Sequence, residues 1–155
     1  VLKRSGISYF KLGQTEGKTA FLLFKRTKLE EFLQKNDSLE ILKSSGYEEF
    51  SFGSILLKFK ERYTTYITQQ GMQFPHEMGL LLGYPTEDVE GFISNEGKNS
   101  LYCGYWKVYK NVAAKKRIFD EFEKSKECII QLLADDIDMQ LILEIYKDEP
   151  RKVAV

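Results

Sequence analysis

The chain has 155 residues, and its 23 basic and 23 acidic side chains give a formal net charge of zero. A domain that holds a nucleic-acid backbone usually carries an excess of Lys and Arg, so the balanced charge argues against a nucleic-acid partner. No apolar stretch reaches the roughly 20 residues of a membrane span, and two cysteines are too few for a disulfide framework. We therefore expect a single cytoplasmic domain over residues 1–155, with reduced thiols and no membrane partner.

The first half of the chain predicts a β-hairpin followed by three helices. Two short apolar runs flank a polar loop bounded by Gly13 and Gly17, a pattern typical of a hairpin. The run at 37–40 has the form of a capping box, and Gly46 suits the position just beyond the end of that helix. Apolar residues at i, i+3, i+4 and i+7 predict the third helix. The predicted elements are strands over 6–12 and 19–25 and helices over 28–34, 37–45 and 51–69.

The second half predicts two short helices, a strand and a long helix. Gly83 suits the end of the first helix, and Thr86 suits the N-cap of the second. Gly91 costs helix stability, so it is expected to permit a close approach of another part of the backbone. The predicted elements are helices over 76–82 and 86–94, a strand over 101–109, a helix from 111 or 112 to 134, and either a strand or a helix over 139–146.

These elements predict an α+β fold with helices packed against an antiparallel sheet. The sheet is expected to have three to four strands, formed by 6–12, 19–25, 101–109 and, if it is a strand, 139–146. Alternation along 101–109 places Cys103, Tyr105, Lys107 and Tyr109 on one face and Tyr102, Trp106 and Val108 on the other. The expected inward positions of the long helix are Ile118, Phe119, Phe122, Cys128, Ile129 and Leu132.

The stretch 74–109 concentrates residue types that carry chemistry, including the only histidine and the only tryptophan. His76 is a candidate general base, a ligand-binding group, or a structural residue that satisfies a helix end or a buried carbonyl. Glu77 follows directly and would point about 100° away on a helix, so Asp88 or an acid distant in sequence is the better candidate to orient the imidazole. Cys103 could form a thiolate–imidazole pair with His76, although a free cysteine in a strand is commonly a small buried hydrophobe.

Metal-binding patterns are absent from this stretch. Leu80 stands where a His-Glu-x-x-His helix would carry its second histidine, and no Cys-x-x-Cys spacing occurs. We therefore predict no metal site and no cofactor.

The aromatic residues around Trp106 predict either a pocket or a strand that is packed on both faces. A pocket would suit a flat ligand or the peptide of a partner protein. Lys107 lies between tyrosines, where it either extends to solvent or holds an anion. The candidate binding residues are His76, Glu77, Tyr84, Asp88, Tyr105, Trp106 and Lys107.

Two segments carry a family resemblance: FPHEMGLLLGYPTEDVEGFI at 74–93 and CGYWKVY at 103–109. With them, the chain closely resembles the uncharacterised bacterial family catalogued as domain of unknown function 3793. The resemblance implies a shared fold and no particular activity. Family members look to begin with a Cys- and Pro-containing segment that this chain lacks. Several also carry extra cysteines where this chain has Leu101 and Tyr105, which weakens thiol or metal chemistry here.

The leading functional hypothesis is a small binding or regulatory protein whose partner is an unidentified protein or small molecule. The absence of a recognised catalytic pattern favours binding over catalysis. One alternative is a hydrolase or transferase with His76 as base and Cys103 as nucleophile or metal ligand. Another is a structural subunit, which predicts an exposed apolar patch instead of a pocket.

Overall fold

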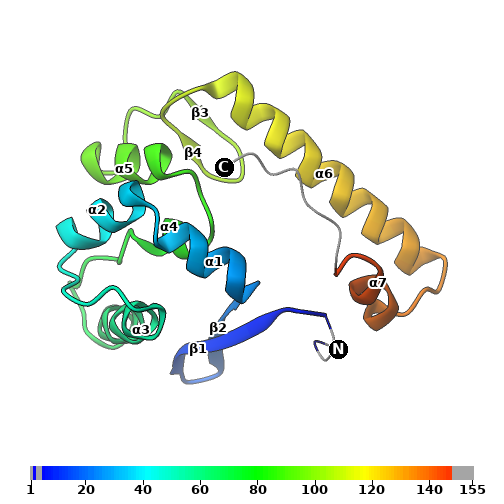
Figure 1. Ribbon diagram of the computed structural model, residues 1–155, viewed down its shortest axis with the longest axis horizontal. Coiled ribbons are helices and arrows are strands. Elements are labelled where there is room, and N and C mark those ends of the chain that lie inside the picture. Colours follow the sequence, from blue (N-terminus) through cyan, green and yellow to red (C-terminus); the bar gives the residue numbers. More distant parts are fainter. Residues whose placement is uncertain (1, 3–4, 148–155) are drawn as a thin grey trace.

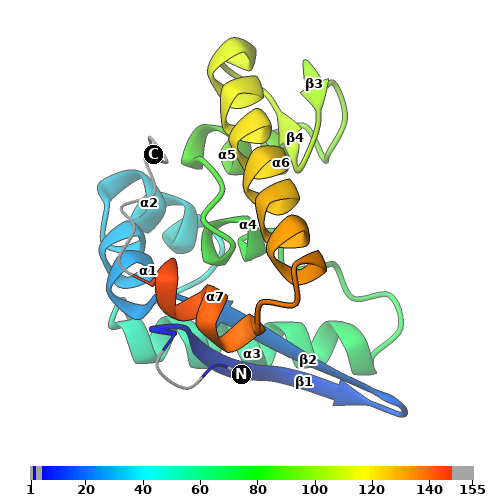
Figure 2. The same ribbon diagram turned by 90° about the vertical axis from the view of Figure 1, so that its right-hand side faces the viewer.

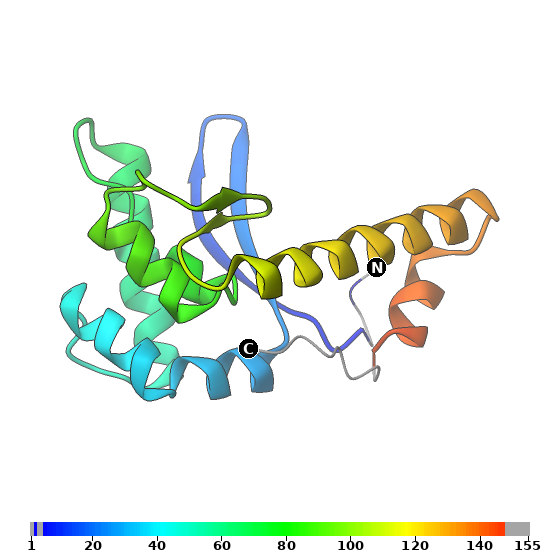
Figure 3. The ribbon, with the colours of Figure 1, turned by 90° about the horizontal axis from the view of Figure 1, so that it is seen from above.

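The computed structural model describes residues 2 and 5–147, which contain two small antiparallel sheets and seven helices (Figure 1). The N-terminal hairpin and the first helices form one side of the molecule, and the long helix α6 extends along the other (Figures 1 and 3). The elements are β1 (Ser8–Thr15), β2 (Lys18–Phe24), α1 (Arg26–Leu33), α2 (Asn36–Ser44), α3 (Phe52–Thr68), α4 (Met78–Leu81), α5 (Thr86–Ser94), β3 (Tyr102–Cys103), β4 (Lys107–Val108), α6 (Val112–Ala134) and α7 (Met139–Ile145).

Strands β1 and β2 form the antiparallel hairpin that the sequence predicts. Gly17 has a φ of 80° in the turn, a conformation that residues with a Cβ rarely adopt. The register shifts once, between Lys11 and Gly13. Leu12 and Leu22 are buried in the core, and β1 packs on α3. One face of the hairpin is therefore buried and the other is exposed.

Helices α1, α2 and α3 surround the main hydrophobic core together with the hairpin and α4. The most deeply buried hydrophobic side chains of this core are Leu33, Leu42, Ile55, Phe59 and Leu80. Gly46 follows α2 with a φ of 86°, which confirms its predicted place beyond the helix end. Ser51 caps α3, because its hydroxyl accepts the backbone N–H of Ser54 at 3.2 Å.

The capping box predicted at 37–40 is wrong. Helix α2 begins at Asn36, its N-cap residue is Lys35, and no side chain caps it. The reason is the short connection: α1 ends at Leu33, so the chain re-enters a helix before it reaches the capping-box residues. Ser38 is fully buried instead, and its hydroxyl has no hydrogen-bond partner within the described part of the chain.

The predicted sheet of three to four strands and the predicted strand over 101–109 are also wrong. Strands β3 and β4 are two residues long and pair only with each other, in a sheet separate from the first hairpin. The chain reverses between them, and Gly104 lies against the ring of Phe119, where a Cβ atom would collide. Only Trp106 and Val108 of this segment are buried, so its alternation reflects a tight hairpin and not one long strand.

Residues 139–145 form a helix, which decides between the two conformations that the sequence left open. The carboxylate of Asp138 accepts the backbone N–H of Gln140 at 2.7 Å and so caps the first turn of α7. The end of α7 lies beside the start of the hairpin (Figure 2). There the ammonium group of Lys25 donates to the carbonyl of Lys147 at 2.7 Å.

Helix α6 is packed in its first half and mostly exposed in its second. Ile118 and Phe119 are buried with Trp106 and Val108 in a second, smaller core. Cys128 is exposed, contrary to its predicted inward position, because the helix runs away from the body of the molecule (Figure 3). Among the described residues, no helix combines the length and the apolar composition that crossing a bilayer requires.

Candidate functional site

The stretch 74–109 folds into α4, α5 and the β3–β4 hairpin. Gly83 ends α4 with a φ of 72°, as predicted. Helix α4 is shorter than predicted, and His76 and Glu77 lie in the turn before it. The prediction of Thr86 as N-cap of α5 is wrong, because Pro85 holds that position and Thr86 is the first helical residue.

Two glycines allow these short elements to approach one another. A Cβ atom at Gly79 would lie 2.7 Å from a methyl group of Val89 on α5. A Cβ atom at Gly91 would lie 2.5 Å from the Cβ of Tyr109, which follows β4. The close approach predicted at Gly91 is therefore confirmed, but the group that approaches is the side chain of Tyr109 and not a backbone segment.

The buried carboxylate of Asp88 fastens the β3–β4 hairpin to α5. Its Oδ2 accepts the indole N–H of Trp106 at 2.8 Å. Its Oδ1 accepts the backbone N–H groups of Tyr109 at 2.8 Å and of Lys110 at 3.3 Å. The Trp106 ring stacks on Tyr84 with 4.9 Å between ring centroids. Asp88 thus orients the tryptophan and makes no hydrogen bond to the imidazole that it was expected to orient.

A pocket of about 330 Å³ lies among α4, α5, β4 and the segment that precedes α4. This volume is at the small end of the ~300–1,000 Å³ range of ligand pockets. It brings together five of the predicted binding residues: His76, Tyr84, Asp88, Trp106 and Lys107. The rest of the wall is formed by Phe74, Met78, Gly79, Leu82, Val89 and Phe92. The wall is therefore predominantly aromatic and aliphatic, with few polar groups.

His76 is half-buried in this wall between two aromatic rings. Its ring centroid lies 5.8 Å from that of Phe74 and 5.0 Å from that of Phe92. No group in the described part of the chain hydrogen-bonds to its imidazole nitrogens. A structural histidine at a helix end or beside a buried carbonyl would have such a partner, so both nitrogens remain available to a ligand.

Lys107 and Tyr84 supply the other polar groups at the pocket. The ammonium group of Lys107 donates to the carbonyl of Gly97 at 2.6 Å and lies 5.8 Å from the ring centroid of Phe92. Burial raises the pKa of the Tyr84 hydroxyl above its ordinary value, so this group stays protonated at neutral pH.

Glu77 lies outside the pocket and has a structural role. Its buried carboxylate accepts the Nε–H of Arg62 at 2.6 Å and the hydroxyl of Tyr47 at 3.0 Å. Burial, followed by the nearby Glu77 charge, raises the pKa of Tyr47 far above its ordinary value. These bonds tie the turn that carries His76 to α3 and to the segment after α2.

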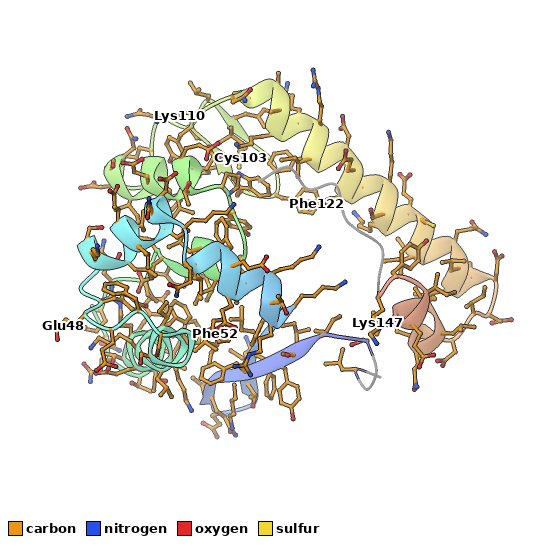
Figure 4. The ribbon with its side chains drawn as sticks, viewed as in Figure 1. Glu48, Phe52, Cys103, Lys110, Phe122 and Lys147 are labelled. Atoms are coloured by element: carbon orange, nitrogen blue, oxygen red, sulfur yellow. The ribbon has the colours of Figure 1, made fainter. Side chains whose placement is uncertain are left out.

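Cys103 and Tyr105 are also outside the pocket. Cys103 is exposed on the hairpin (Figure 4), so the pocket that contains His76 holds no thiol. The exposed Tyr105 hydroxyl donates to Glu123 of α6 at 2.6 Å, and this hydrogen bond raises its pKa. In the described residues, no group of three or more His, Cys, Asp or Glu side chains is arranged to hold a metal ion.

A comparison with protein families matches residues 1–143 to the family described as "Protein of unknown function (DUF3793)". The chain belongs to this family. The match confirms the resemblance found from 74–93 and 103–109. Searches of the curated proteins and of the solved structures found no match. The geometry of this DUF3793 chain is therefore the basis on which its function is inferred.

Sequence reasoning missed most of the apolar wall of the DUF3793 pocket. None of the candidate binding residues was among the apolar residues that line it, which are Phe74, Met78, Leu82, Val89 and Phe92. Apolar residues on a short helix look the same in sequence whether they face a core or a cavity. The one available signal was their position within the segment that carries the family resemblance.

Proposed function

We propose that this protein is a binding protein whose small-molecule ligand occupies the pocket around His76 and Trp106. The observation that carries the proposal is a half-buried imidazole without a hydrogen-bond partner in the described residues, set in a wall that is otherwise mainly apolar. Ligand sites typically combine such an apolar surface with a few convergent polar groups. A cytoplasmic location and the absence of a nucleic-acid partner stay predictions from the sequence.

Binding has better support than hydrolysis or group transfer. A base at His76 would need a nucleophile or an orienting acid within hydrogen-bonding reach. Cys103 does not line the pocket, and the carboxylates of Glu77 and Asp88 are engaged by other donors. The residues that line this pocket can hold a molecule, and they include no serine, threonine or cysteine that His76 could activate as a nucleophile.

The proposal predicts that filling the pocket excludes an apolar probe. N-phenyl-1-naphthylamine, an uncharged dye that fluoresces in apolar surroundings, is titrated into the wild type and into Leu82→Trp. Leu82 lines the pocket and is half exposed, so a larger side chain there fills the cavity at its rim with little effect on the core. We expect dye affinity to fall by about tenfold or more, equivalent to ~1.4 kcal/mol.

Leu57→Trp is the matched control. Leu57 is also an exposed helical leucine, but it lies on α3 and does not line the pocket. Its variant should bind the dye as the wild type does. Equal dye affinity in all three proteins, or no binding to the wild type, would contradict the proposed site.

A further inference from the structure

The polar groups that the pocket leaves available to a ligand are mainly hydrogen-bond donors. Lys107 uses one of its three N–H groups on the Gly97 carbonyl, which leaves two. The imidazole of His76 offers an N–H, and the protonated hydroxyl of Tyr84 can donate as well. Neither His76 nor Tyr84 has a side-chain hydrogen bond within the described part of the chain. A ligand with acceptor atoms would satisfy these groups.

Acidic groups near the site do not provide matching acceptors. The Asp88 carboxylate is buried, and three N–H groups already occupy its two oxygens. Glu77 pairs with Arg62 and Tyr47 outside the pocket. A cationic ligand would therefore find no free carboxylate and would meet the positive charge of Lys107.

Lys107 and His76 both line the pocket and have a common neighbour in its wall. Both contact the ring of Phe92: the Lys107 Nζ lies 5.8 Å from its centroid, and the His76 centroid lies 5.0 Å from it. Charge-assisted hydrogen bonds to a carboxylate are about twice as strong as bonds between neutral groups. The aromatic and aliphatic wall would take the hydrocarbon part of the same molecule, because its burial removes apolar surface from water.

We infer that the ligand is an apolar organic acid, with its carboxylate held by Lys107 and His76 and its hydrocarbon part against Trp106, Phe92 and Leu82. This inference rests on the proposed function and adds the chemical class of the ligand. The carboxylate is the essential element, and the hydrocarbon part is either a chain or a ring.

Two matched sets of probes test the charge and the shape of the ligand. One set is octanoate, octanamide and octylamine; the other is 3-phenylpropanoate, its amide and 3-phenylpropylamine. Trp106 is the only tryptophan and lines the pocket, so its emission excited at 295 nm reports each titration. We expect at least one acid to bind the wild type about tenfold more tightly than its amide, the factor that a charge-assisted hydrogen bond supplies.

The variant Lys107→Met removes the ammonium group and keeps the apolar stem. In this variant the ratio of acid to amide affinity should fall from about ten to about one, because the charged donor that accounts for the tenfold difference is lost. Lys98→Met is the control, because Lys98 is exposed nearby in sequence and does not line the pocket. It should keep the wild-type ratio. Lys107→Gln provides a second neutral side chain if the Met variant fails to fold.

The outcomes separate this inference from the proposed function. Equal affinity for acid and amide in the wild type, or tighter binding of the amine, would overturn the organic-acid inference. The organic-acid inference is also overturned if none of the six probes binds the wild type, while the uncharged dye binds the wild type more tightly than it binds Leu82→Trp. If the dye also fails to bind at the pocket, the proposed function fails with it.

Discussion

Asp88 is the single residue on which the site most depends. Its buried carboxylate joins α5 to Trp106 and to the backbone after β4 through three hydrogen bonds. Trp106 in turn stacks on Tyr84 and packs edge-on against Phe119 of α6, with ring centroids 4.5 Å apart. One acidic side chain thereby positions the aromatic wall of the pocket.

The variant Asp88→Asn should strongly destabilise the protein. An amide has one acceptor oxygen, so its NH₂ group would face an N–H that the carboxylate now accepts. We expect the free energy of unfolding to fall by about 3 kcal/mol, because buried hydrogen bonds to a charged group are lost and a donor is left unpaired. Chemical denaturation followed by Trp106 emission measures this loss.

Asp120→Asn is the control for this change. Asp120 is exposed on α6, and its replacement should alter the free energy of unfolding by no more than about 0.5 kcal/mol. If the two variants are equally stable, the carboxylate of Asp88 does not hold the hairpin in place.

At the scale of elements, the site depends on how closely α5 and the β3–β4 hairpin pack. Gly91 is a poor helix former in the middle of α5, yet its missing side chain makes room for Tyr109. The glycine lowers the local stability of the helix, but it allows α5 and the segment after β4 to pack closely. Gly53, in the first turn of α3, has nothing near the place where a Cβ would stand.

Alanine substitutions at these two helical glycines should have opposite effects. Gly91→Ala gains about 1 kcal/mol of helix propensity but forces the Cβ atoms of residues 91 and 109 apart. Because overpacking costs about 1–3 kcal/mol and a backbone shift is needed here, we expect a net loss of about 1–2 kcal/mol. Gly53→Ala should gain about 0.5 kcal/mol, less than the interior value, since it lies in the first turn.

Thermal and chemical unfolding of both variants measure these changes. Stabilisation by Gly91→Ala would show that the hairpin does not approach α5 as closely as described.

Across the whole molecule, burial is unevenly distributed. The main core and the smaller core around Trp106 meet at Tyr84, which packs against both. Beyond them, the second half of α6 and the helix α7 expose several large apolar side chains: Ile130, Leu133, Leu141 and Ile145. The outer face of the first hairpin also exposes Tyr9, Phe21 and Leu23. These surfaces are the observation that would support the structural-subunit alternative.

This distribution predicts a gradient of local stability. Backbone amides of α3 around Ile55 and Phe59 should be the best protected from hydrogen exchange, because both side chains are fully buried. Amides in 124–134 should exchange at least about tenfold faster, since few buried contacts resist local opening there. Hydrogen-exchange mass spectrometry of the full chain resolves the two helices. Equal protection would mean that another chain covers the exposed part of α6.

The sequence by itself determined most of the local elements and the segment that lines the pocket. Apolar periodicity predicted α3, and two apolar runs around a glycine-bounded loop predicted the first hairpin. Glycines marked the ends of α2 and α4. The unusual residues of 74–109 marked the segment that forms the pocket. These features are readable because they depend on side-chain spacing and backbone freedom within a few residues.

Only the tertiary structure decided which of those residues share a site. The Glu77 carboxylate forms hydrogen bonds with Arg62 and Tyr47 outside the pocket. His76, the residue before it, lines the pocket. Alternation over 101–109 predicted one strand, but the segment forms a tight hairpin. In this hairpin Gly104 packs against Phe119, and Trp106 donates a hydrogen bond to Asp88. The orientation of a polar side chain depends on partners that lie far away in sequence, and a local sequence pattern does not identify those partners.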